Sequence, residues 1–112
     1  MAEKNLKYAM LFDVYGSLLS EKQSNAFEMY YCDDLSLAEI AEHIGITRQG
    51  VRDQIKHAED ELEKLESKLG LFEKSNKLHN IFDELKAEAS KCGCEEKLIS
   101  CIDRATDIID NW

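Results

Sequence analysis

The chain has 112 residues, a formal net charge of −9 and a pI near 4.8. That length suits one domain with a modest core, and an acidic chain is on average repelled by a phosphate backbone. The absence of proline and the abundance of Glu, Lys, Leu and Ala favour helices, because these residues lose little side-chain freedom in a helix. We expect an all-α cytoplasmic protein without membrane insertion: residues 1–5 lack a signal-peptide pattern, and no apolar run approaches the roughly 20 residues of a membrane span.

Three helices are predicted before residue 46. The first covers about residues 4–14 and ends at Gly16. The second begins after Ser20, which forms a capping box with Gln23, and ends at Asp33-Asp34. A further capping box, Ser36-Leu37-Ala38-Glu39, opens the short third helix.

The segment of about residues 36–56 has the spacing of a helix-turn-helix. Ala41 is small where two helices would cross, and Gly45 permits the positive φ of the turn. Thr47 is the predicted N-cap of a fourth, long helix of about Arg48–Lys68. Aliphatic residues are expected to fill the wedge between the helices: Ile40, Ile44, Ile46, Val51 and Ile55.

Residues 1–70 are therefore predicted to form a helix-turn-helix domain. A seam with 3-4 spacing follows on the fourth helix, and it could pair with another helix of this chain or of a second copy. Its members are Ala58, Leu62, Leu65, Leu69 and Phe72, with Gly70 as the predicted C-cap.

Residues 71–112 are predicted to form a C-terminal helical hairpin that packs on the first domain or on a second copy. Its helices would cover Ser75–Ser90 and Glu95–Asp110, with Cys92-Gly93-Cys94 as the turn. The positions expected to face inward are Leu78, Ile81, Phe82, Leu85, Ala89, Leu98, Cys101, Ile102, Ala105, Ile108, Ile109 and Trp112.

A basic stripe marks the fourth helix. Arg48, Arg52 and Lys56 recur every four residues and so share one face. Residues 46–58 carry these three cations and one aspartate, a net charge of +2 in a chain of −9. With Thr47 and Gln49 they form the predicted DNA-binding set, because Arg can pair with guanine and Gln with adenine in the major groove. The alternative is a solvated face, paired with neighbouring carboxylates.

The pattern resembles two known groups of proteins. Leu19–Gln23, Leu35–Ala41 and Thr47–Val51 resemble the C-terminal DNA-binding region of bacterial sigma factors. The closer resemblance is to the YlxM family of small helix-turn-helix proteins. It includes Leu11–Leu19, Tyr30-Tyr31 with Asp33–Leu37, and the long helix carrying Glu59, Leu62, Leu65 and Leu69.

The resemblance has implications for fold and function. It implies a sigma-factor-like helix-turn-helix bundle with long C-terminal helices, in which Arg48, Gln49 and Arg52 match positions that face DNA. Members of the YlxM family are encoded beside the signal recognition particle GTPase, which implies a regulatory association with that bacterial targeting pathway.

Other sites are less well supported by the sequence. Cys92, Cys94 and Cys101 suggest a metal site, but zinc needs four ligands and Cys101 also fits an apolar helix stripe. No motif provides a nucleophile with its base or a phosphate-binding loop. We therefore expect no catalysis, no metal and no cofactor.

Two hypotheses follow from these patterns. The first is a DNA-binding regulator that acts as a homodimer through the leucine seam or the C-terminal helices. The second is an adapter that binds a component of the signal recognition particle pathway and uses the helix-turn-helix only as a scaffold.

Overall fold

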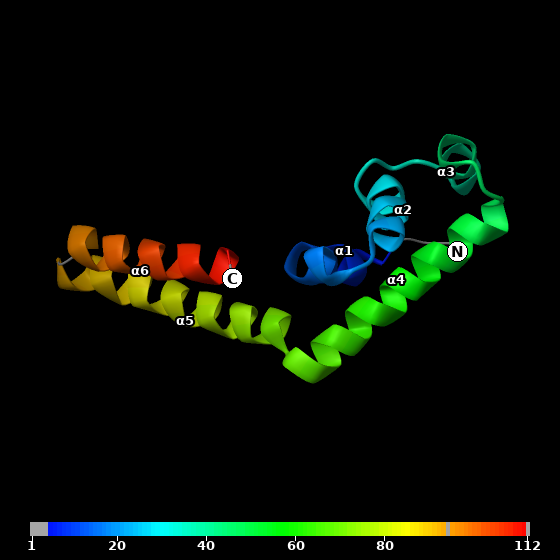
Figure 1. The fold of residues 1–112 in the computed structure, drawn as a ribbon. Helices are drawn as coiled ribbons and strands as arrows, with labels where there is room; N and C mark the ends of the chain where they lie inside the picture. Colours follow the sequence, from blue (N-terminus) through cyan, green and yellow to red (C-terminus); the bar gives the residue numbers. More distant parts are fainter. Residues whose placement is uncertain (1–4, 94, 112) are drawn as a thin grey trace. The chain divides into compact units, whose positions relative to one another are not determined.

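The computed structural model describes residues 5–93 and 95–111, and this part of the chain is helical without a strand. Its α-helices are α1 (Leu6–Tyr15), α2 (Glu21–Tyr31), α3 (Leu37–Ile44), α4 (Arg48–Leu69), α5 (Leu71–Cys92) and α6 (Glu95–Asp110), with a short 3-10 helix η1 (Gly16–Leu18) (Figure 1). The all-α prediction is confirmed. The chain divides into two compact units between Gly70 and Leu71. None of the described helices combines the length and apolar character that a membrane span needs.

Two capping boxes start helices α2 and α3. Ser20 Oγ accepts from the Gln23 backbone N–H at 3.2 Å, and Gln23 Oε1 accepts from the Ser20 backbone N–H at 3.4 Å. Ser36 and Glu39 make the same reciprocal pair, with both distances at 3.1 Å. Both predicted helix starts are therefore confirmed, because each box satisfies donors that the first helical turn leaves unpaired.

The first helix ends at Gly16 as predicted, whereas the second ends earlier than predicted. Gly16 is the C-cap of α1 and has a right-handed φ of −54°. The backbone then continues through η1 and becomes extended at Leu19. Helix α2 ends at Tyr31, before the predicted Asp33-Asp34, and the reversal to positive φ occurs at Asp34.

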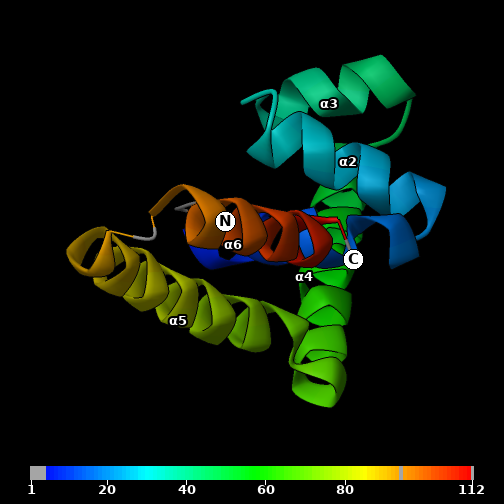
Figure 2. The same cartoon turned by 90° about the vertical axis from the view of Figure 1, so that its left-hand side faces the viewer.

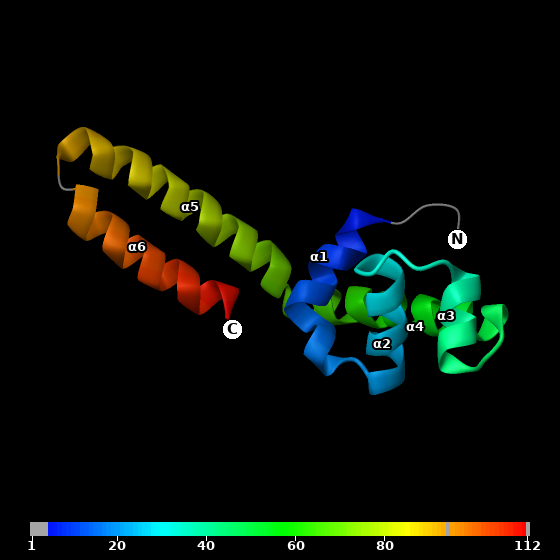
Figure 3. The same ribbon diagram turned by 90° about the horizontal axis from the view of Figure 1, so that it is seen from above.

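Helix α4 is the long element of the N-terminal unit, and α1, α2 and α3 pack along it (Figure 3). Between α2, α3 and α4 lies a buried cluster of Ala26, Tyr30, Ile40, Ala41, Val51 and Ile55. Most of the predicted wedge is therefore correct. Ile46 is the exception, because it remains 38% exposed and lies over Gly50 at the first turn of α4 rather than between the helices.

Part of the leucine seam on α4 packs inside the N-terminal unit of the same chain. Ala58 and Leu62 are fully buried in the N-terminal unit, so Leu62 cannot serve as a contact for a second copy. Gly70 ends α4 with a φ of +64°, and its backbone N–H donates to the Glu66 carbonyl at 2.8 Å. The predicted cap is confirmed, whereas Phe72 belongs to α5 and not to this seam.

Helices α5 and α6 form an antiparallel hairpin (Figure 2 and Figure 3). Helix α5 begins at Leu71, four residues before the predicted Ser75, and continues to Cys92. The early start has a local reason: a single left-handed Gly70 already ends α4, and the Leu-Phe-Glu-Lys sequence that follows contains no helix breaker.

The apolar stripe of the hairpin is only partly buried. Ala89, Ile102 and Ile109 are buried, as predicted. Several positions expected to face inward are instead exposed: Ile81, Leu85, Leu98, Cys101 and Ile108. A helix in a two-helix pair can hide only one narrow stripe, and the apolar stripes here are wider. Cys94 of the predicted turn and Trp112 lie outside the described residues.

Candidate nucleic-acid interface

The turn between α3 and α4 has the geometry of a helix-turn-helix. Gly45 ends α3 with a φ of +77°, and its backbone N–H donates to the Ala41 carbonyl at 2.9 Å. Two residues later, Thr47 Oγ1 accepts from the Gly50 backbone N–H at 3.0 Å and caps α4. The left-handed glycine thus reverses the chain at one end of the N-terminal unit, and the threonine starts the next helix (Figure 1).

The first turns of α4 have one buried and one exposed side. Val51 and Ile55 are fully buried against the other helices of the unit. The five predicted DNA-binding residues are all exposed: Thr47, Arg48, Gln49, Arg52 and Lys56. Since the spacing of four residues keeps the cations on one side, the structure brings them together on a helix whose adjoining side is fixed in the core.

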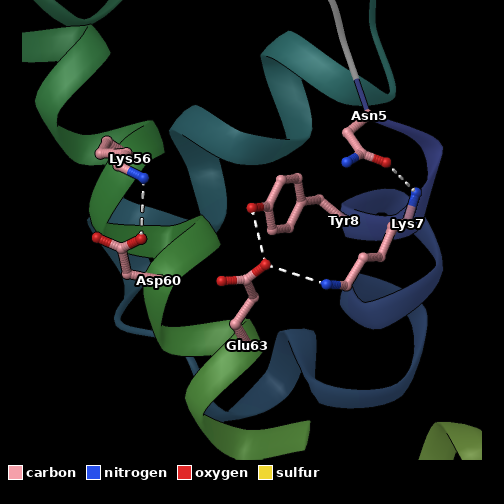
Figure 4. Close-up of polar contacts among 6 residues, drawn as sticks. All are labelled: Asn5, Lys7, Tyr8, Lys56, Asp60 and Glu63. Atoms are coloured by element: carbon pink, nitrogen blue, oxygen red, sulfur yellow. Dashed lines mark hydrogen bonds and ion pairs between the residues drawn. The ribbon is translucent and has the colours of Figure 1, made fainter.

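Two members of this set are held by carboxylates of the same helix. Gln49 Nε2 donates to Asp53 Oδ1 at 3.0 Å, and Lys56 Nζ pairs with Asp60 Oδ1 at 3.1 Å (Figure 4). The hydrogen bond to Asp60 raises the pKa of Lys56. Such exposed i,i+4 contacts are worth only a few tenths of a kcal/mol, so a ligand can replace them.

Arg48 and Arg52 differ from Lys56 in this respect. Neither forms an ion pair with any residue that the structure describes. The interpretation of the stripe as a paired, solvated face therefore holds for Lys56 but not for the two arginines. Their guanidinium groups are therefore available to an anionic partner.

A network of polar contacts fixes α1 to the turns of α4 that follow Lys56. Glu63 Oε1 accepts from Lys7 Nζ at 3.1 Å and from the Tyr8 hydroxyl at 3.0 Å (Figure 4). These two donors lower the pKa of Glu63. Burial, followed by the hydrogen bond to Glu63, raises the pKa of Tyr8 to about 12.

Glu63 is one of three glutamates that accept from tyrosines. Tyr31 donates to the buried Glu59, and Tyr15 donates to Glu66 at 2.5 Å. Residues 59, 63 and 66 share one side of α4, so this tyrosine–glutamate ladder connects α1 and α2 to α4. The sequence analysis missed it. The signal that could have found it is the spacing of the three glutamates, which places them together beside the buried side of α4.

Of the three cysteines that were considered for a metal site, the structure describes two. Cys92 and Cys101 are exposed, while Cys94 is outside the described part of the chain. Over residues 5–93 and 95–111, no three His, Cys, Asp or Glu side chains are grouped closely enough to hold a metal ion.

Comparison with known proteins adds the family. A family model described as "Putative helix-turn-helix protein, YlxM / p13 like" matches residues 2–102. The chain belongs to this family. The resemblance found from the sequence motifs is thereby confirmed.

Curated relatives are similar along most of their length. A UPF0122 protein of Halalkalibacterium halodurans is 43% identical over 103 residues, which are 92% of this chain and 94% of the relative. Another from Bacillus velezensis is 45% identical over 101 residues, 90% of this chain and 92% of the relative. A third, from Listeria innocua, is 44% identical over 91 residues, 81% of this chain and 83% of the relative.

Proposed function

We propose that this YlxM-like protein is a DNA-binding regulator that reads double-stranded DNA with the N-terminal turns of α4. One observation supports this above the others: Arg48 and Arg52 stand exposed and unpaired within the described structure, on a helix whose other side is locked into the core. The proposal includes no catalytic step and no cofactor. A protein with this role works in the cytoplasm, where bacterial DNA is found.

Each residue of the set has a role that suits its chemistry. Arg48 and Arg52 can pair bidentately with guanine, and Gln49 can pair with adenine. Thr47 and Lys56 would contact phosphates and fix the register of the helix. Even if all three cations met phosphates, the slope of log affinity against log salt would be only about −2.7. We therefore propose that the protein binds as a homodimer on two half-sites.

Selection of duplexes from a random pool at about 50 mM salt, where phosphate attraction is strong, tests this proposal. The wild-type protein should enrich a defined site, and an Arg48→Glu, Arg52→Glu variant should lose it. The matched control is Lys64→Glu, Lys68→Glu, which makes the same charge change at exposed positions farther along α4. Enrichment that survives the arginine variant, or no enrichment at all, would contradict the proposal.

The acidity of the chain favours a second candidate. A net charge of −9 opposes DNA, and Asp53 and Asp60 stand within the basic stripe. The candidate is an adapter that binds the signal recognition particle GTPase through another surface. Calorimetry with the purified GTPase tests it, because an adapter should bind the wild type and the arginine variant equally well.

A further inference from the structure

The two flanks of the α5–α6 hairpin differ in polarity. On one flank, Lys86 Nζ pairs with Asp103 Oδ1 at 3.2 Å, and His79 Nε2 lies 3.1 Å from Asp110 Oδ1. Both contacts cross from α5 to α6. They fix the register of the hairpin, because residue 86 is level with residue 103 and residue 79 with residue 110.

The other flank is apolar. With 3.6 residues per turn, Ile81 and Leu85 lie on the side of α5 that carries neither Lys86 nor His79. The exposed fractions are 50% for Ile81, 48% for Leu85, 45% for Leu98 and 69% for Ile108. A groove of about 250 Å³ runs between the helices here, lined by Phe82, Leu85, Leu98, Cys101, Ile102 and Ala105.

This width of apolar surface is typical of a four-helix bundle. A helix in a simple pair needs a stripe of about two residues in seven, whereas a bundle helix needs about three in seven. In α6 the apolar side chains at 98, 102, 105 and 109 form the narrow stripe, and Cys101 and Ile108 widen it. The hairpin therefore supplies two helices of a bundle that needs two more.

Charges beside the apolar flank indicate what supplies the other two. Lys97 and Arg104 border it on α6, and Glu84 and Glu88 border it on α5; all four are exposed. Glu88 Oε1 pairs with Lys91 Nζ at 3.4 Å, and Arg104 donates to Cys101 Sγ at 3.2 Å, and both are exposed contacts within one helix that a partner can replace. From the register set by the two crossing contacts, Glu84 is level with residue 105 and Glu88 with residue 101. The acidic edge of α5 thus lies at the height of the basic edge of α6.

We propose that a second copy of this chain covers the apolar flank, so that two hairpins form an antiparallel four-helix bundle. In this dimer the two-fold axis runs parallel to the helices, and each α5 lies against α6 of the second copy. In both halves of the interface, Glu84 is then level with Arg104 of the second copy, and Glu88 lies at a height between its Arg104 and Lys97. The inference rests on the homodimer of the proposed function, but its test uses no DNA, so the two can fail separately.

A charge exchange tests the arrangement with the full-length protein. Glu84→Lys, Glu88→Lys places like charges across the interface, and so does Lys97→Glu, Arg104→Glu. Each variant alone should raise the dimer dissociation constant in sedimentation equilibrium by about tenfold or more, since like charges at an interface are costly. An equimolar mixture should recover the wild-type constant, because every interface then joins an acidic to a basic edge.

A second pair of variants tests the apolar contact. Ile81→Glu should convert the dimer to a monomer of 12.9 kDa. Leu18→Glu changes a similarly exposed leucine of the N-terminal unit and should leave the dimer intact. Circular dichroism of each variant confirms that the helices remain.

The outcomes separate the second copy from other occupants. A wild-type protein that is monomeric at about 100 µM would overturn the proposal and point to another partner. Its dimer dissociation constant would then exceed about 100 µM, which is weaker than that of an ordinary specific dimer. A dimer that resists both Ile81→Glu and the charge variants would show that copies associate elsewhere. Failure of the mixture to recover would overturn the proposed arrangement of the helices.

Discussion

The Tyr31 hydroxyl donates a hydrogen bond to Glu59, across 28 residues of sequence and between α2 and α4. Glu59 is only 6% exposed. Burying a carboxylate without a hydrogen-bond donor costs free energy, and the Tyr31 hydroxyl offsets this cost at Glu59. Tyr31 also stacks on Phe27 with ring centroids 4.3 Å apart, and Phe27 stacks on Phe12 at 4.6 Å. This hydrogen bond therefore connects the aromatic stack of α1 and α2 to α4.

Removing this phenol should destabilise the N-terminal unit. Tyr31→Phe keeps the ring stack but leaves Glu59 without the donor, so the free energy of unfolding should fall by about 1–3 kcal/mol. Urea denaturation measures it. In a Glu59→Met background the same tyrosine change should cost far less, because no carboxylate remains to be satisfied. Equal losses in both backgrounds would contradict a coupled pair.

A second contact of the ladder predicts sensitivity to alkali. The pKa of Tyr8 is raised to about 12 from its ordinary value of 10.0. Above pH 10 the unfolded chain loses this proton while the folded chain keeps it. The stabilisation is therefore complete below pH 10 and is lost as the pH rises toward 12.

Urea denaturation between about pH 9 and pH 12 checks this loss against a variant without the phenol. Wild-type protein should lose more stability over that range than Tyr8→Phe, which has no proton to release at this position. The prediction fails if the two stability curves stay parallel. The pKa of Tyr31 is also raised, but this group titrates in both proteins and cancels.

Local features of the fold could be predicted from sequence, and contacts between distant residues could not. The boxes at Ser20 and Ser36 and the left-handed Gly45 depend on residues within three or four positions. The burial of Glu59 depends on a tyrosine 28 residues away, which no periodicity identifies. Ile81 was expected to be buried because its spacing fits a helix stripe, but spacing does not say how many helices share the core.

The candidate interface, like the fold, has features that the sequence could predict and features that it could not. Exposure of Arg48 and Arg52 follows from helical periodicity and could be predicted. The contact of Gln49 with Asp53 also follows an i,i+4 spacing, although the sequence analysis assigned Gln49 only to DNA. The tyrosine–glutamate ladder could not be predicted, because it depends on how α1 and α2 pack against α4.

Gly45 provides the most direct test of the turn that places α4. Its φ of +77° costs an L-residue about 1–2 kcal/mol, although a Cβ there would meet no atom within 4 Å. Gly45→Ala should therefore lower the unfolding free energy by about that amount. Gly45→Asn should lose less, because asparagine enters the left-handed region more readily. Thermal denaturation of the wild type and the two variants gives the order of their stabilities. If the alanine and asparagine variants proved as stable as the wild type, the turn in solution would not require the left-handed backbone. Another backbone conformation would then have to produce the helix-turn-helix geometry on which the placement of Arg48 and Arg52 depends.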